Sequence, residues 1–331
     1  MASQSANAVY LRTYLAPLAG FLERADVTDI FINAPGEVWT ETIGGVLERH
    51  SAPELDDTTL WRLARQIASL SHQGVSREHP LLSATLPEGE RVQVIAPPAT
   101  RGHLAIAVRK HVVADLSLDD YHRAQAFEGV RTDGAADPQD VDTELRALLQ
   151  AGETVAFLRA AVRARKNIVV AGGTSTGKTT FLNALLKEIP REERLILIED
   201  AAEVQLDHPN AVGLVAVRGE TGEAKVTAED LVQASLRMRP DRIILGELRG
   251  REAASYLRAI NTGHPGSITT LHADSPRGVI DQLTLLVLQA GLNLGRAEIA
   301  DYARSIIDVF VQLSRKDGRR VVSEIVMRPD A

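Results

Sequence analysis

The sequence contains no cysteine among its 331 residues, and aromatic residues make up only 4% of it. Without cysteine the chain can form neither disulfides nor thiolate metal sites, which fits a reducing compartment. No apolar run approaches the roughly 18 residues that a membrane-spanning helix needs. The start, MASQSANAVYLRTYLAPLAG, lacks a basic region followed by a long apolar core, so we expect no secretory signal. These absences predict a soluble, cytoplasmic protein.

Basic residues are also fewer than acidic residues. The chain has 37 lysines and arginines against 44 acidic residues, which gives a net charge of -7 at pH 7. This balance argues against a protein that coats nucleic acid, and the scarce aromatics provide no platform for base stacking. We therefore expect no sequence-specific nucleic-acid binding. The 44% hydrophobic and 24% charged content is typical of a globular protein, and the length suits two domains.

The first 113 residues alternate helix and strand patterns. Asp57 precedes a segment in which apolar residues share a helical face up to Leu70, so it is a candidate N-cap. The stretch TDIFINAPGEVWTETIGGVLERH contains strands separated by Ala-Pro-Gly and Gly-Gly turns, and RVQVIAPP and LAIAVRK are further strands. We predict an α+β domain with an antiparallel sheet over residues 1–113.

Residues 114–150 are acidic and dotted with glycine, which indicates a linker with a helical piece at each end. From residue 151 to 331, strands such as NIVVAG, RLILIED and DRIILGE alternate with helices, and the chain closes on a hairpin with an Asp-Gly turn. Nearly continuous apolar strands between helices predict a mostly parallel sheet with both faces covered. The fold class is α/β, with a P-loop NTPase core and a separate α+β N-terminal domain.

A phosphate-binding loop joins one of these strands to its helix. The stretch VVAGGTSTGKTTFLNALL has the spacing of that motif, in which a glycine-rich turn and a helix N-terminus direct N–H groups at a phosphate. Lys178 supplies a charge for the β- and γ-phosphates, and the hydroxyl of Thr179 is a ligand for Mg²⁺. The residues expected to bind ATP are Gly172, Gly173, Thr174, Ser175, Thr176, Gly177, Lys178, Thr179 and Thr180.

Acidic residues follow two neighbouring strands. Glu247 ends RIILGE, where P-loop enzymes usually have an aspartate, and Glu199 and Asp200 end RLILIED. Ligands bind at the carboxyl ends of parallel strands. One carboxylate can hold metal-bound water while the other orients the attacking water. The alternative is that these residues cap helices or pair with nearby arginines.

Two histidines lie in NTGHPGSITTLHADS. An isolated histidine is more often structural than catalytic, but we expect His264 and His272 to reach the same sheet edge as the phosphate loop. That position favours a γ-phosphate sensor, with His272 the better candidate. Metal binding is less favoured because no carboxylate or cysteine has suitable spacing nearby. Several arginines lie near these motifs. Either they pair with carboxylates, or one of them acts as an arginine finger across a subunit interface. They are Arg237, Arg239, Arg242 and Arg249.

The segments GGTSTGKTT, LIEDAAEV, LRMRPDRIILGELRG and TGHPGSITTLHADSP, in this order, resemble the secretion ATPase superfamily. They match its Walker A loop, Asp box, Walker B with glutamate and His box across the second half of the chain. The compact arrangement is similar to the Vir- and Trb-type traffic ATPases of type IV secretion and conjugation. This resemblance implies a RecA-like core, a homo-hexameric ring and peripheral attachment at the cytoplasmic face of the inner membrane. The implied partners are inner-membrane secretion proteins, including other secretion ATPases.

The resemblance also implies roles for individual residues. Glu199 would activate the attacking water, Glu247 would serve the metal shell, and the segment with His264 and His272 would sense phosphate. The family places arginines of its N-terminal domain on the phosphates, and the matching residues are Arg91 in GERVQV and Arg109 in AVRK. Without the resemblance, these two are strand arginines of the kind that solvent usually covers.

The hypothesis that follows is a ring machine in which the γ-phosphate closes the N-terminal domain and hydrolysis releases it. The linker would be the hinge, and its length would also permit a domain swap between subunits. A pilus-assembly or type II secretion motor is the nearest alternative. Assembly motors usually carry a tetracysteine zinc module that this chain cannot form, whereas retraction motors lack it and stay an alternative. A nucleic-acid translocase and a nonenzymatic ATP-binding scaffold are alternatives of other classes.

Overall fold

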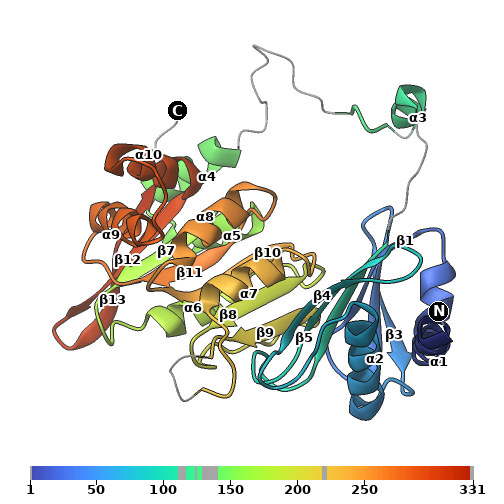
Figure 1. Cartoon of the computed structure of the whole chain (residues 1–331). Coiled ribbons are helices and arrows are strands. Elements are labelled where there is room, and N and C mark those ends of the chain that lie inside the picture. Colours follow the sequence, from blue (N-terminus) through green and yellow to red (C-terminus); the bar gives the residue numbers. More distant parts are fainter. Residues whose placement is uncertain (1, 111–116, 124, 129–140, 218–221, 329–331) are drawn as a thin grey trace.

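The computed structural model describes residues 2–110, 117–123, 125–128, 141–217 and 222–328, and these residues form two sheets with separate sets of helices (Figure 1). This arrangement of sheets and helices confirms the predicted α/β class. None of the helices in these ranges has the length and apolar character needed to span a bilayer.

The first sheet is antiparallel with the order β3-β2-β1-β6-β5-β4. Helices α1 (Ala2–Glu23) and α2 (Asp57–Leu70) pack on one face of it through leucines such as Leu18 and Leu63, which are fully buried. The N-cap of α2 is Asp56 rather than Asp57, since its side chain accepts the Thr59 N–H at 2.7 Å. The strands are β1 (Val27–Ile32), β2 (Gly36–Thr42), β3 (Leu47–Ala52), β4 (Leu81–Thr85), β5 (Arg91–Ile95) and β6 (Ala105–Arg109).

Two helices lie in the segment that we expected to be a linker. Helix α3 (Leu118–Arg123) has no buried residue. Helix α4 (Val141–Gln150) packs on the second domain, because Leu145 is 1% exposed and shares an apolar cluster with Phe157. The packed part of the second domain therefore begins at α4.

The second sheet has the order β13-β12-β7-β11-β10-β8-β9, with β13 antiparallel to β12 and the other paired strands parallel. This agrees with the mostly parallel sheet predicted from the apolar strands. The strands are β7 (Ile168–Gly172), β8 (Leu195–Glu199), β9 (Ala211–Val215), β10 (Arg242–Leu248), β11 (Ile268–Leu271), β12 (Val309–Lys316) and β13 (Arg319–Met327).

Alternate residues of these strands face two separate apolar clusters. Ile168 and Val170 pack with one set of helices, and Val169 and Ala171 pack with the other, which is the two-residue period of a strand buried on both faces. On the first face lie α4, α5 (Thr154–Arg163) and α6 (Lys178–Leu186). On the second lie α7 (Ala228–Ser235), α8 (Glu252–Asn261), α9 (Pro276–Gln289) and α10 (Arg296–Ile306).

The N-terminal domain packs against the β9 edge of the second sheet (Figure 1). Apolar side chains such as Phe31 and Ile95 join the cluster on the α7–α10 face. Polar contacts add to this interface, because Arg194 is fully buried and donates from Nη1 to Asn33 Oδ1 at 2.9 Å. Contacts of both kinds therefore join the two domains within one chain.

Candidate active site

The phosphate loop connects β7 to α6 through a turn with left-handed residues. Ser175 has a φ of 60° and Gly177 a φ of 93°, so the chain reverses sharply before the helix begins. A Cβ on Gly172 would lie 2.8 Å from the carbonyl oxygen of Leu313, so only glycine fits where β12 approaches. Gly172 and Gly177 are thus required by the loop's own geometry.

Lys178 points back into this turn from the first residue of α6. Its Nζ donates to the carbonyl oxygens of Gly172 at 3.0 Å and Gly173 at 3.2 Å. The residue is only 9% exposed, and burial lowers the pKa of its ammonium, an effect that the Glu247 carboxylate partly offsets. A phosphate anion in the loop would meet this cation at close range.

A cavity of about 460 Å³ opens over the loop at the carboxyl edge of the sheet. This is the edge at which ligands bind in parallel α/β sheets. Around it lie residues 174–180 together with Glu199, Asp200, Glu203, Gly246, Glu247, Arg249, Thr270, His272 and Arg320.

Glu247 is the centre of a charged cluster in this cavity. Its Oε1 lies 2.7 Å from His272 Nε2 and 4.0 Å from Lys178 Nζ. Its Oε2 accepts from Arg249 Nε at 2.6 Å, and Arg249 also lies 3.5 Å from Asp200. The lysine of the loop, the glutamate near the end of β10 and the histidine after β11 therefore meet at one point.

Glu199 approaches the same cavity from the end of β8. Its side chain is 4% exposed, and Oε1 accepts the backbone N–H groups of Glu203 at 3.1 Å and Val204 at 2.8 Å. Its Oε2 is ion-paired with Arg101 Nη2. Sequence reasoning missed Arg101, because an arginine in the turn PATRGH carries no signal that it will meet a residue almost a hundred positions further on.

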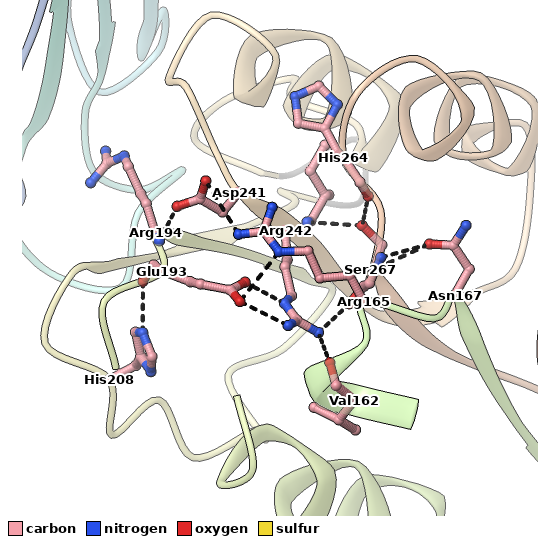
Figure 2. A network of polar contacts seen from close by, with 12 residues as sticks. Val162, Arg165, Asn167, Glu193, Arg194, His208, Asp241, Arg242, His264 and Ser267 are labelled. Atoms are coloured by element: carbon pink, nitrogen blue, oxygen red, sulfur yellow. Dashed lines mark hydrogen bonds and ion pairs between the residues drawn. The ribbon is translucent and has the colours of Figure 1, made fainter. Parts of the chain in front are cut away.

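His264 lies at the amino ends of the parallel strands, opposite the phosphate loop. This corrects the expectation that both histidines lie at the same ends as that loop. It precedes β11 and His272 follows it, so a single strand separates them. The His264 Nδ1 is 2.9 Å from the carbonyl oxygen of Ala259 at the end of α8. Figure 2 shows His264 within a polar network at the amino ends of β8 and β10.

That network also contains Arg242. It is fully buried, and its guanidinium makes a two-point ion pair with Glu193, at 2.5 and 2.9 Å (Figure 2). Its Nη1 donates to the carbonyl oxygen of Val162 at 2.7 Å. These contacts give Arg242 a structural role, because a buried guanidinium with its donors engaged cannot reach across a subunit interface. Arg239 pairs with Asp241 at 2.6 Å.

Arg91 and Arg109 do not line the phosphate cavity of their own chain. They are paired opposite each other on β5 and β6 and line a second hollow, of about 630 Å³, together with Arg237. This hollow therefore places the two arginines apart from the phosphate loop of the same chain.

A magnesium ion fits the donor set of the phosphate cavity. The described residues contain no group of three or more histidine, aspartate and glutamate side chains placed to hold a metal on their own. Mg²⁺ does not require such a group, because it commonly binds one or two protein oxygens together with phosphates and waters. Thr179 and Glu247 both line the cavity and offer a hydroxyl and a carboxylate.

The parallel sheet, the glycine-rich loop and the lysine and carboxylates around one cavity define a P-loop NTPase. Comparison with known proteins refines this class. The family model for type II/IV secretion system proteins matches residues 135–321. The chain belongs to this family and, within it, to the VirB11-type ATPases of type IV secretion systems.

Full-length relatives support this assignment. The VirB11 proteins of Bartonella quintana and Brucella suis are both 39% identical to this chain, over 96% and 98% of it and 92% of each relative. The PtlH homologue of Bordetella bronchiseptica is 38% identical over 93% of both chains. The crystal structure of the Brucella suis VirB11 ATPase in complex with sulphate has a TM-score of 0.91 at 37% identity, and the match covers 99% of this chain and 97% of that one.

Proposed function

We propose that the chain binds MgATP in the phosphate cavity and hydrolyses it to move its two domains, as the motor of a type IV secretion or conjugation system. The observation that carries this proposal is the convergence of Lys178, Glu247 and His272 on one point beside the phosphate loop. Phosphate release from ATP by the purified chain tests it directly. A chain that binds ATP without turnover would favour the scaffold alternative.

Each residue around the cavity has a chemical task in this proposal. The amides of residues 173–179 and the Lys178 ammonium bind the β- and γ-phosphates. Thr179 and Glu247 hold Mg²⁺, which when bound neutralises charge on the phosphate oxygens. Glu199 accepts a proton from the attacking water. His272 contacts the γ-phosphate and, because it is already in hydrogen-bond range of Glu247, links the γ-phosphate to that carboxylate.

Arg320 is a cation of the cavity that sequence motifs did not indicate. It comes from the start of β13, and a Cβ on Gly177 would lie 3.1 Å from its Cδ, so the side chain covers the loop. We expect Arg320→Ala to raise the KM for ATP about two- to fivefold, because the residue is exposed and screened by water. Steady-state kinetics measures this, with Arg315→Ala in the preceding strand as control. An unchanged KM would remove Arg320 from the nucleotide site.

The phosphate arginines would come from a neighbouring subunit. Arg91 and Arg109 line a hollow separate from the cavity of their own chain, so a ring in which each N-terminal domain faces the next core would bring them to a nucleotide. This arrangement is part of the homo-hexamer that we propose, which includes the option of a domain swap.

A subunit-mixing experiment tests this arrangement. We expect Lys178→Ala and the double variant Arg91→Gln, Arg109→Gln each to have little turnover, and their mixture to recover a part of it. Recovery follows because an intact loop on one subunit then meets intact arginines on its neighbour. If both groups acted within one chain, every site in the mixture would lack one of them and no turnover would return. Two samples of the double variant mixed together provide the control.

Domain motion driven by this cycle would power channel or pilus assembly and substrate transfer. The proposed location is the cytoplasmic face of the inner membrane, where the ring would contact secretion-complex proteins and other secretion ATPases. We propose no sequence-specific contact with nucleic acid, in keeping with the net charge of -7.

A further inference from the structure

A loop of the N-terminal domain adds to the edge of the second sheet. Residues 99–101, between β5 and β6, run antiparallel to β9. The Val215 N–H donates to the Ala99 carbonyl oxygen at 2.9 Å, and the Arg101 N–H donates to the Gly213 carbonyl oxygen at 3.0 Å. These main-chain bonds fix the point from which the Arg101 side chain starts.

The Arg101 side chain crosses β9 over Gly213. A Cβ on Gly213 would lie 2.4 Å from Arg101 Cδ, so glycine is needed to let the side chain pass. Beyond this point Nη1 donates to the Val204 carbonyl oxygen at 2.8 Å, and Nη2 is ion-paired with Glu199. With 21% of the side chain exposed, the guanidinium lies largely out of water against the core domain.

These contacts occupy both oxygens of the Glu199 carboxylate. Oε1 accepts the N–H groups of Glu203 and Val204, and Oε2 faces Arg101. A general base needs an oxygen within about 2.6–3.2 Å of the water oxygen whose proton it removes. In this arrangement the oxygen that the core domain leaves open is held by a residue of the N-terminal domain.

We propose that Arg101 is a positioning residue that holds Glu199 in a resting state, and that movement of the N-terminal domain withdraws it and frees Glu199 to accept a proton from water. The inference rests on the proposed role of Glu199 as the base for ATP hydrolysis. The backbone bonds of residues 99–101 and the side chain of Arg101 belong to one loop, so displacing the N-terminal domain breaks them together. Domain position thereby controls the proton acceptor within the same chain.

Removing the guanidinium tests this control. We expect Arg101→Gln to raise the kcat for ATP about three- to tenfold, which corresponds to about 0.7–1.4 kcal/mol in the barrier, while KM stays unchanged. A gain in kcat is not an effect that loss of folding produces. Arg101→Lys keeps a cation near Glu199 and should stay close to the wild type.

A second variant displaces Arg101 without deleting it. Gly213 has no positive φ, so its backbone accepts alanine, and the added Cβ pushes the arginine side chain aside. Gly213→Ala should therefore raise kcat in the same direction. The control is Arg77→Gln, which removes another ion pair between the domains. Arg77 Nη2 donates to Glu223 Oε2 at 2.7 Å, and this pair is exposed to solvent and does not include Glu199. This control should leave kcat unchanged.

The outcomes separate this inference from the proposed function. If Arg101→Gln and Gly213→Ala leave kcat unchanged or lower it while the wild type and the control variant remain active, Arg101 does not restrain Glu199. A lower kcat with Arg101→Lys rescue would mean that the arginine assists the base instead. If Glu199→Gln retained full turnover, the proposed function itself would fail, whatever Arg101 does. If the inference is right, adding Glu199→Gln to Arg101→Gln abolishes the gain.

Discussion

Replacing Lys178 by alanine should lower ATP turnover by about a hundredfold or more. The ammonium would make charge-assisted hydrogen bonds to two phosphates, each worth about 1.5–3 kcal/mol, and their joint loss corresponds to at least that factor. The fold should survive, because the variant removes a cation whose pKa burial already lowers. Phosphate release and binding of a fluorescent ATP analogue measure the two effects, and both should fall.

Lys187→Ala is the matched control, since Lys187 is an exposed lysine at the other end of the same helix. It should keep turnover and nucleotide affinity at the wild-type level. Should Lys178→Ala still bind and split ATP like the wild type, the phosphate loop would not be the nucleotide site.

Replacing Glu199 by glutamine should lower kcat by about 10²–10⁴-fold with little change in ATP affinity, because glutamine keeps the shape but cannot accept the proton. The amide oxygen can still accept the N–H groups of Glu203 and Val204, so the local structure is retained. Single-turnover phosphate release, measured beside nucleotide binding, separates the chemical step from affinity.

The control for this variant is Glu203→Gln, which changes an exposed carboxylate that lines the same cavity. We expect it to keep most of the turnover. If Glu203→Gln and Glu199→Gln proved equally harmful, the effect would come from the negative charge of the cavity rather than from a base at Glu199.

The architecture of the core domain could be predicted from the sequence because its signals are local. Strands such as IVVAG and RIILGEL are apolar on both faces, and the loop between Gly172 and Lys178 has a fixed spacing. The rule that ligands gather at the carboxyl ends of parallel strands brought Glu199, Glu247 and Lys178 to one edge, and the cavity contains all three.

The features that sequence reasoning missed depend on how distant segments meet. Arg101 reaches Glu199 only because the N-terminal domain packs on β9, and no periodicity encodes that contact. Arg320 reaches the loop because β12 and β13 form a hairpin beside β7. The expectation for His264 was wrong because this residue precedes β11. It therefore lies at the amino end of that strand, whereas the phosphate loop lies at the carboxyl ends of the parallel strands.

A structure of the protein with Mg²⁺ and a nonhydrolysable ATP analogue tests the central claim most directly. We predict the triphosphate within the amides of residues 173–179, with Lys178 on its terminal phosphates, Glu247 beside the metal and Glu199 facing a water in line with the γ-phosphate. A nucleotide bound elsewhere, or a triphosphate in the loop with Glu199 turned away from the γ-phosphate, would contradict it.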